Sequence, residues 1–317
     1  MRMGQGGNRW VIVLSGGNGE RLAPLVRLVL GKAVPKQYCA FSGSRTMLEH
    51  TYDRALALAP EERVVTVIGR DHRCHLNRAC RPPGRIVEQP ANLDTAPGIF
   101  LPAAYVRAAD PDATVVILPS DHFIRPQGRF TMRVELAALW AERLPGRLIL
   151  LAAEAEGPET DYGWIEPGWR LSEHFGAVPR EAVRFHEKPS ASDAKGFHRR
   201  GFLWNTFIIA CKVRTLWTLG RRLLPGLMAG FDAFSGSLGE PDEAAALEAL
   251  YRGMPSVNFS KAVLERAQGR IGVLPLEGVE WDDWGRPERV ESALARLGRE
   301  MPVWRPATAR VPVLAHA

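Results

Sequence analysis

Residues 14–25 read LSGGNGERLAPL and continue directly from the apolar run 10–14. A short buried strand that ends in closely spaced glycines is typical of phosphate-binding loops, because a backbone without side chains can turn its N–H groups toward phosphate oxygens. Arg21 adds a permanently charged, forked donor. Two familiar motifs do not fit, since no Lys-Ser/Thr follows at Walker spacing and Leu22 replaces the third glycine of a dinucleotide-binding loop. On the glycines alone, an ordinary Gly-rich turn is an equal alternative.

The segments around this loop alternate between short apolar runs and longer amphipathic stretches, which is the pattern of βαβ units. The further predicted strands are 63–68, 114–118 and 148–153, and the predicted helices are 46–58, 71–79, 95–108 and 130–143. Ligands of such folds bind outside the carboxyl ends of the strands, where Ser15 and Ser120-Asp121 fall. We therefore predict an α/β fold with a Rossmann-like mixed, mostly parallel sheet flanked by helices.

The regular alternation ends after Leu151. Irregular strands at 162–168 and 183–186 predict an antiparallel extension of the main sheet. The later predicted elements are helices at 213–224, 241–251, 259–267 and 287–297, a strand at 270–274, and a mobile Gly- and Ser-rich loop at 226–240. No internal repeat or clear linker is visible, so we expect a single domain over 1–300 followed by a tail, 301–317.

Composition and charge exclude several classes of protein. The chain has 317 residues, 46% hydrophobic and 24% charged, which is the balance of a soluble globular protein. A net charge of +6 suits a small anionic substrate as well as a polyanion. Four cysteines in no disulfide-dense pattern predict a reducing compartment, here the cytoplasm. Neither a membrane span nor a signal core is visible, so we expect no secreted, membrane-bound, collagen-like or disordered protein.

The sequence Pro35-Lys36-Gln37-Tyr38 follows the glycine loop. A lone lysine is usually solvated, but one placed close behind a phosphate loop can neutralise a second phosphate group. Together the two motifs resemble those of the sugar-1-phosphate nucleotidyltransferases, and of mannose-1-phosphate guanylyltransferases in particular. Their signature is similar to GGxGxRLxPL followed by PKQ and an aromatic residue.

Further segments resemble motifs of this family in the same order along the chain. They read QPANLDTAP (89–97), LPSDHFI (118–124), TDYGWIE (160–166), FHEKP (185–189), LWNT (203–206) and WDDWG (281–285). The resemblance implies the nucleotide-diphospho-sugar transferase fold, in which the antiparallel extension binds the sugar. It also implies that a nucleoside monophosphate is transferred from a nucleoside triphosphate, GTP first, to a sugar 1-phosphate, mannose 1-phosphate first, with release of pyrophosphate.

The resemblance implies catalytic roles for Arg21, Lys36 and Asp121, and a Mg²⁺ ion held by Asp121 and Asp283. Two carboxylates with nucleotide phosphates completing the shell suit Mg²⁺. Asp282 is the alternative ligand. Taken singly, Asp121 also fits a turn or N-cap residue and Asp283 a solvated loop acid.

The other implied contacts divide between the two substrates. The nucleotide-binding residues are Leu14, Gly16, Gly17, Gly19, Glu88, Gln89, Thr95 and Ser120, and the sugar-phosphate-binding residues are Gly163, Glu187, Lys188 and Asn205. For Glu187-Lys188 alone, an exposed charged hairpin tip is the alternative. A sugar phosphate is largely dianionic at neutral pH, with a second pKa of about 6, so the reaction needs no general base.

Four positions depart from the family pattern. The segment between Arg21 and Pro35 is longer by about four residues, Ser15 stands where Ala is usual, and Asp94 replaces Asn. Gln89 stands where guanylyltransferases carry Glu, with Glu88 adjacent. A carboxylate accepts both N1–H and N2–H of guanine, whereas an amide suits uracil or thymine better. A UTP- or dTTP-dependent enzyme therefore remains an alternative to a GTP-dependent one.

Other interpretations were weighed against this one. A non-catalytic NDP-sugar-binding regulator conflicts with retention of the motif residues, and a glycosyltransferase conflicts with the absence of an Asp-x-Asp motif at 120–122. A zinc site at His72, Cys74, His75 and Cys80 lacks a Cys-x-x-Cys pair. We expect no nucleic-acid or membrane partner and consider a homodimer possible. The 32 residues that follow Gly285 are too few for the C-terminal β-helix of many relatives.

Overall fold

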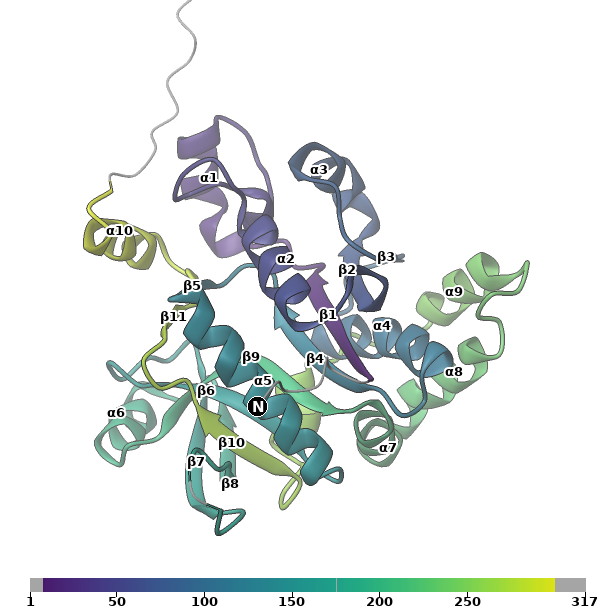
Figure 1. Ribbon diagram of the computed structural model, residues 1–317. Coiled ribbons are helices and arrows are strands. Elements are labelled where there is room, and N and C mark those ends of the chain that lie inside the picture. The colour runs from purple at the N-terminus through teal and green to yellow at the C-terminus, as the bar shows by residue number, and fades with distance from the viewer. Residues whose placement is uncertain (1–7, 175, 300–317) are drawn as a thin grey trace, which may run out of the picture.

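The computed structural model describes residues 8–174 and 176–299, so the predicted tail at 301–317 lies outside the described residues. A nine-stranded sheet in the order β3-β2-β1-β4-β9-β6-β10-β8-β7 runs through the molecule (Figure 1). Its strands are β1 (Arg9–Ser15), β2 (Val64–Gly69), β3 (Arg85–Gln89), β4 (Thr114–Pro119), β6 (Leu148–Glu154), β7 (Gly163–Arg170), β8 (Arg180–Glu187), β9 (Leu203–Lys212) and β10 (Ile271–Pro275). A separate two-stranded ribbon pairs β5 (Phe123–Arg125) with β11 (Glu280–Asp282).

Ten α-helices surround the sheet in the described part of the chain. They are α1 (Ala23–Leu30), α2 (Met47–Leu58), α3 (Arg73–Ala79), α4 (Thr95–Ala109), α5 (Gln127–Arg143), α6 (Ala191–Arg199), α7 (Val213–Leu223), α8 (Pro225–Ser235), α9 (Glu243–Arg252) and α10 (Pro287–Arg296). None of these described helices combines the length and apolar character that a membrane span requires. All four cysteines are free thiols.

The sheet is mixed, as predicted, and its two halves differ in strand direction. Strands β3, β2, β1 and β4 are parallel, so their carboxyl ends lie at one edge. Strand β9 then runs antiparallel between β4 and β6. Strands β7 and β8 form the expected antiparallel extension, and Trp164 of β7 also pairs with Trp204 of β9. The antiparallel part is therefore as extensive as the parallel part.

Side chains alternate between two hydrophobic cores on the two faces of the sheet. On β1, Ile12 faces one core while Val11 and Val13 face the other. Helices α4, α7 and α8 cover the first face, and α2 and α5 cover the second (Figure 1). This arrangement leaves the carboxyl edge of β1–β4 to the loops.

Several predicted elements differ from the observed ones. The loop expected at 226–240 is largely helix α8, because Leu227, Met228, Phe231 and Phe234 form a buried face at helical spacing. Gly and Ser residues between them concealed this pattern. The helix expected at 259–267 is a short π-helical turn, Ser260–Leu264. Strands β3 and β9 and helices α1 and α6 were not predicted.

A third, smaller cluster ties the C-terminal segment to the beginning of the chain. Trp284 is 2% exposed, stacks on Phe123 with ring centroids 4.8 Å apart, and meets Phe41 edge-on at 5.6 Å. Leu22 of the segment after the glycine loop and Val290 of α10 belong to the same cluster. Trp284 therefore fixes the residues on either side of it close to the glycine loop.

We expect Trp284→Ala to lower the free energy of unfolding by about 3–5 kcal/mol, because removing a buried indole loses both its transfer energy and its packing contacts. Urea denaturation followed by circular dichroism measures this. Trp169→Ala is the matched control, since Trp169 is 69% exposed and its loss should leave the midpoint nearly unchanged. Equal effects of the two substitutions would contradict the anchoring role of Trp284.

Candidate active site

The predicted nucleotide-binding residues gather at the carboxyl edge of the parallel strands. Leu14 is in register with Pro119, and the N–H of Ser120 donates to the Leu14 carbonyl at 3.0 Å. Gly69 of β2 is in register with Gln89 of β3. The loops that follow β1, β3 and β4 therefore emerge side by side.

The glycine loop is held from below by side chains. Gln37 Nε2 donates to the carbonyl oxygens of Ser15 (3.1 Å) and Gly17 (2.9 Å). His72 donates from Nδ1 to the Ser15 carbonyl at 3.2 Å. Because C=O and N–H of one peptide plane point in opposite directions, these bonds turn the loop N–H groups the other way. Such an arrangement suits an anion.

Two glycines of the loop are required by close contacts. A Cβ atom at Gly16 would lie 2.5 Å from Gln89 Nε2. Gly19 has a φ of +63°, and a Cβ there would lie 3.1 Å from the Lys36 Cβ. The loop can therefore approach Gln89 and Lys36 only without side chains.

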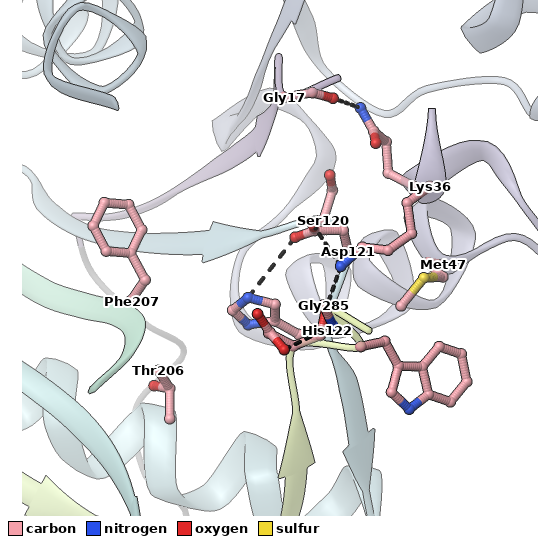
Figure 2. Close-up of polar contacts among 12 residues, drawn as sticks. Gly17, Lys36, Met47, Ser120, Asp121, His122, Thr206, Phe207 and Gly285 are labelled. Carbon is pink, nitrogen blue, oxygen red and sulfur yellow. Dashed lines mark hydrogen bonds and ion pairs between the residues drawn. The ribbon is translucent and has the colours of Figure 1, made fainter. Parts of the chain in front are cut away.

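Lys36 lies at the centre of the site. Its side chain is 5% exposed, and its ammonium group pairs with Asp121 Oδ2 at 2.9 Å and donates to the Asp283 carbonyl oxygen. The solvated-lysine alternative is therefore wrong. Burial raises the pKa of the Asp121 carboxyl, but the Lys36 ammonium and His122 outweigh burial and leave that pKa below its usual value. Figure 2 shows Lys36, Asp121 and Gly285 lying together, with Ser120 beside them.

The loop after β4 is fixed by α2 and by the β5–β11 ribbon. Thr51 and Arg54 of α2 donate to the carbonyl oxygens of Ser120 and His122, both at 3.4 Å. Trp281 Nε1 donates to His122 Nδ1 at 3.1 Å, and burial lowers the pKa of His122 to about 4. The imidazole is therefore neutral. The ribbon brings Asp121 close to the segment that contains Asp283.

The two adjacent aspartates of the C-terminal motif point to different partners. Asp283 Oδ1 accepts from the Tyr162 hydroxyl at 3.0 Å and from Gly285 N–H at 2.8 Å. Asp282 Oδ1 accepts from Trp284 N–H at 2.6 Å, and burial raises the pKa of Asp282 to about 7. The Asp283 carboxylate thus faces the other site residues, whereas that of Asp282 closes the local turn.

Arg21 lies between two carboxylates at the entrance of the site. It contacts Asp161 Oδ2 at 3.2 Å and Asp283 Oδ2 at 3.3 Å, and its side chain is 54% exposed. Asp161 also pairs with Arg286 at 2.6 Å, and Asp283 with Arg289 at 3.3 Å. Asp161 and Asp283 are therefore each paired with two arginines.

The residues expected near the base are buried or engaged. Gln89 is 3% exposed, and its Oε1 accepts from the Tyr251 hydroxyl at 3.3 Å. Glu88 pairs instead with Arg73. Thr95 begins α4, and its hydroxyl oxygen accepts from Phe259 N–H at 2.8 Å.

The predicted sugar-phosphate residues lie on the antiparallel extension. Gly163 is in register with Glu187, and a Cβ at Gly163 would lie 2.9 Å from Glu187 Oε2. Glu187 bonds Ser260, and burial raises the pKa of its carboxyl. It is therefore not part of an exposed hairpin tip. Lys188 is exposed, with a φ of +49°. Asn205 is 8% exposed and accepts from Phe207 N–H at 3.1 Å.

A cleft of about 480 Å³ joins the two halves of the site. The predicted residues that line it are Gly19, Arg21, Lys36, Asp121 and Lys188. Gly163, Glu187, Asn205 and Gln89 are not among the described residues that form its walls. The cleft thus brings three cations around one space that is large enough for a ligand, since ligand pockets typically measure about 300–1,000 Å³.

The chemistry of the donor set fits a divalent cation bound partly by substrate. Asp121 and Asp283 both contact Lys36, the first through its carboxylate and the second through its carbonyl. No group of three or more His, Cys, Asp or Glu side chains is arranged to hold a metal in the described part of the chain. Mg²⁺ commonly takes one or two carboxylates and completes its shell with phosphates and water. Asp121, which lines the cleft, and Asp283, whose carboxylate contacts Arg21 at the entrance, are oxygen donors of this kind.

Sequence reasoning missed several residues that build the site. Gln37 and His72 support the glycine loop, and Asp161 and Arg289 pair with Arg21 and Asp283. Gln37 and Asp161 lie inside motifs recognised in the sequence, and this location could have identified them as site residues. His72 and Arg289 carried no such signal, because only the fold brings them near the loop.

The chain matches the family model described as nucleotidyl transferase over residues 10–295. It belongs to the nucleotidyltransferase family. Its sequence is 30% identical over 280 residues to the xanthan biosynthesis protein XanB of Xanthomonas campestris, and 27% identical over 283 residues to a mannose-1-phosphate guanylyltransferase of Escherichia coli. Each match covers 86% of this chain but only 57% of the relative, so the chain spans about half the length of these proteins.

Solved structures show the same fold. A mannose-1-phosphate geranyltransferase from Thermus thermophilus superposes with a TM-score of 0.74 at 29% identity, covering 93% of this chain and 80% of the other. The inositol-1-phosphate CTP transferase from T. maritima, at 16% identity, has a TM-score of 0.58 and supports the fold alone. The predicted family and fold class are therefore confirmed.

We expect Gln37→Ala to weaken binding of a nucleoside triphosphate by about tenfold or more, because two loop carbonyls lose their buried donor. Gln37→Glu should weaken it at least as much, since a carboxylate cannot donate to a carbonyl. Isothermal titration calorimetry measures both. Asn77→Ala removes an exposed amide from α3 and is the control. Unchanged affinity in both Gln37 variants would contradict the supporting role.

Proposed function

We propose that this nucleotidyltransferase transfers GMP from GTP to mannose 1-phosphate, forming GDP-mannose and pyrophosphate. The observation that carries this proposal is the cleft in which Arg21, Lys36 and Lys188 surround one space beside Asp121. Those cations suit a triphosphate and a sugar phosphate bound side by side. The similarity to a mannose-1-phosphate guanylyltransferase of Escherichia coli supports GTP and mannose 1-phosphate as substrates. The similarity to xanthan and alginate biosynthesis proteins supports a role in nucleotide-sugar supply.

The triphosphate would bind at the glycine loop. The loop N–H groups, Arg21 and Lys36 would neutralise its phosphates, and Ser120 and Thr95 would border the nucleoside. Arg21 must then leave Asp161 and Asp283 for the phosphates. Because the loop N–H groups and Lys36 are already in place, they can stabilise charge on the α-phosphate with little reorganisation.

The sugar phosphate would bind on the other side of the cleft. Lys188 would hold its phosphate, while Glu187 and Asn205 would bind sugar hydroxyls close to the Gly163 backbone. A phosphate oxygen then attacks the α-phosphorus in line, the new P–O bond forms, and the bond to the pyrophosphate breaks. The nucleophile is already ionised, so positioning and charge neutralisation account for catalysis.

Mg²⁺ would be held by the carboxylates of Asp121 and Asp283. When bound, it would neutralise phosphate charge between the two aspartates. Lys36 contacts the Asp121 carboxylate and the Asp283 carbonyl and would hold the two residues near one another. Asp282 is less suited to this role because its carboxylate bonds Trp284 N–H.

Gln89 favours a second candidate, a UTP- or dTTP-dependent enzyme with the same chemistry. Its Oε1 accepts from Tyr251, which directs Nε2 toward Gly16 in the glycine loop. An amide that offers a donor suits a base with a carbonyl acceptor, whereas guanine also presents N1–H and N2–H. The choice between bases therefore depends on one side chain.

Measuring pyrophosphate release by the purified protein in the presence of Mg²⁺ tests the reaction. Each of GTP, UTP, dTTP, ATP and CTP is combined in turn with mannose 1-phosphate and with glucose 1-phosphate. We expect the highest rate with GTP and mannose 1-phosphate. Asp121→Asn should lower kcat by about 10³-fold, since it removes a charge that acts at the reacting phosphate. Asp112→Asn, which removes an exposed carboxylate paired with Arg214, should leave kcat unchanged. No release in any combination would instead favour a non-catalytic NDP-sugar-binding regulator.

The substitution Gln89→Glu tests whether residue 89 selects the base of the nucleotide. With a carboxylate at this position, we expect the ratio of kcat/KM for GTP to that for UTP to rise by about 10-fold or more, since two guanine N–H donors gain an acceptor. The same pyrophosphate assay measures the ratio. Glu88→Gln is the matched control, because Glu88 pairs with Arg73. A larger shift in the Glu88 variant would assign base recognition to that residue.

A further inference from the structure

A second cavity, of about 460 Å³, lies outside the cleft described above. The segment after α1, the beginning of α2 and helix α3 form its walls. We call it the insertion pocket, because its wall at 32–34 belongs to the segment that lengthens this chain between Arg21 and Pro35. It is defined by Lys32, Val34, Tyr38, Glu49, His75 and Arg78.

Positive groups converge on the insertion pocket. Burial lowers the pKa of His75, and the nearby charges of His72, Arg78 and Lys32 lower it further, so these groups lie close to one another. In the part of the chain that the structure describes, Lys32 and Arg78 form no ion pair with a carboxylate. Lys32 and Arg78 therefore line the pocket without a carboxylate partner among the described residues.

Among the described residues, Glu49 is the one carboxylate that lines the insertion pocket, and it is already engaged. Glu49 Oε2 accepts from the Thr46 N–H at 2.7 Å, and the Glu49 N–H donates to Thr46 Oγ1 at 3.2 Å, which together form the capping box of α2. Glu49 Oε1 is 3.9 Å from the Arg45 guanidinium. Glu49 thus serves the helix N-terminus and Arg45, and the pocket retains a net positive lining.

The insertion pocket also has an aromatic and apolar lining. The rings of Tyr38 and His75 stack with centroids 5.7 Å apart and an angle of 26°. Leu30 and Val34 add apolar surface. A bare inorganic ion would use the cations alone, whereas a phosphate ester would also cover these surfaces. The combination fits a small organic molecule that carries a phosphate group.

The pocket adjoins the glycine loop through two residues. The Tyr38 hydroxyl lies 3.5 Å from Ser15 Oγ, and the His72 ring, which meets Tyr38 edge-on at 5.7 Å, bonds the Ser15 carbonyl. Lys36 follows the insertion within two residues of Val34. The pocket is therefore separate from the cleft, but its wall residue Tyr38 contacts both Ser15 of the glycine loop and His72, which supports that loop.

We propose that the insertion pocket is a second binding site, for a small phosphorylated molecule such as a sugar phosphate or a nucleotide. Lys32 and Arg78 bind its phosphate, and Tyr38 and His75 contact its organic part. This site does not depend on the proposed reaction, because binding can be measured without turnover.

Calorimetric titration with inorganic phosphate tests the site in an Arg21→Ala/Lys188→Ala background, which removes two cations from the cleft. We expect phosphate still to bind to this double variant, at the insertion pocket. Adding Lys32→Ala/Arg78→Ala should weaken that binding by about tenfold or more, since each charge-assisted bond to phosphate is worth about one order of magnitude. Adding Lys195→Ala/Arg199→Ala, which removes the same charge from the exposed surface of α6, should leave it unchanged.

Two phosphate esters, a hexose 6-phosphate and a nucleoside monophosphate, are then titrated into the same double variant. Comparing their affinities distinguishes a sugar phosphate from a nucleotide as the ligand. Tighter binding of one ester than of inorganic phosphate supports an organic ligand and identifies its class. Absence of phosphate binding in the background protein would overturn the proposal. Equal losses of phosphate affinity in the α6 variant and the pocket variant would also overturn the proposal, because the loss would then follow from the change in net charge alone.

Discussion

The buried ammonium group of Lys36 is the constraint on which the site depends. A lysine that is 5% exposed is stable only when its charge is paired and its donors are satisfied. Asp121 supplies the charge, and the Asp283 carbonyl supplies an acceptor. Three segments far apart in the sequence are therefore fixed around one nitrogen atom, and the position of each depends on the other two.

The rest of the fold satisfies this constraint from several directions. Parallel pairing of β1 with β4 places the Asp121 loop beside the glycine loop, and the β5–β11 ribbon brings the Asp283 segment against it. Packing of Trp284 on Phe123 and Phe41 then holds that segment against the Asp121 loop and the early part of the chain. The hydrophobic contacts act on neighbours of the charged residues, so the charged groups are positioned without themselves forming the core.

The predictable parts of this molecule were those with a local signal. Buried strand–glycine–helix patterns located β1, β2, β4 and the phosphate loop, and the motif segments located Lys36, Asp121 and Asp283. Strand β9 was missed because its pairing with β4 and β6 is non-local, and α8 because Gly and Ser residues concealed its buried face. The support of the loop by His72, and the fixing of Gln89 by Tyr251, join residues separated by 57 and 162 positions. No local pattern encodes such contacts.

Two of the cations that contact the predicted metal ligands, Arg21 and Lys36, differ in how freely they can change partners. Arg21 is 54% exposed, and exposed ion pairs contribute only about 0–1 kcal/mol each, so leaving Asp161 and Asp283 for a phosphate costs little. Lys36 is less free to change partners, because its side chain is only 5% exposed and its ammonium would lose its charge partner if it left Asp121 and the Asp283 carbonyl. In the proposed complex, the fixed cation would define where the phosphates lie, and the exposed one would follow them. Division of the charge between a buried lysine and a surface arginine gives the site both a permanent geometry and an opening that a substrate can enter.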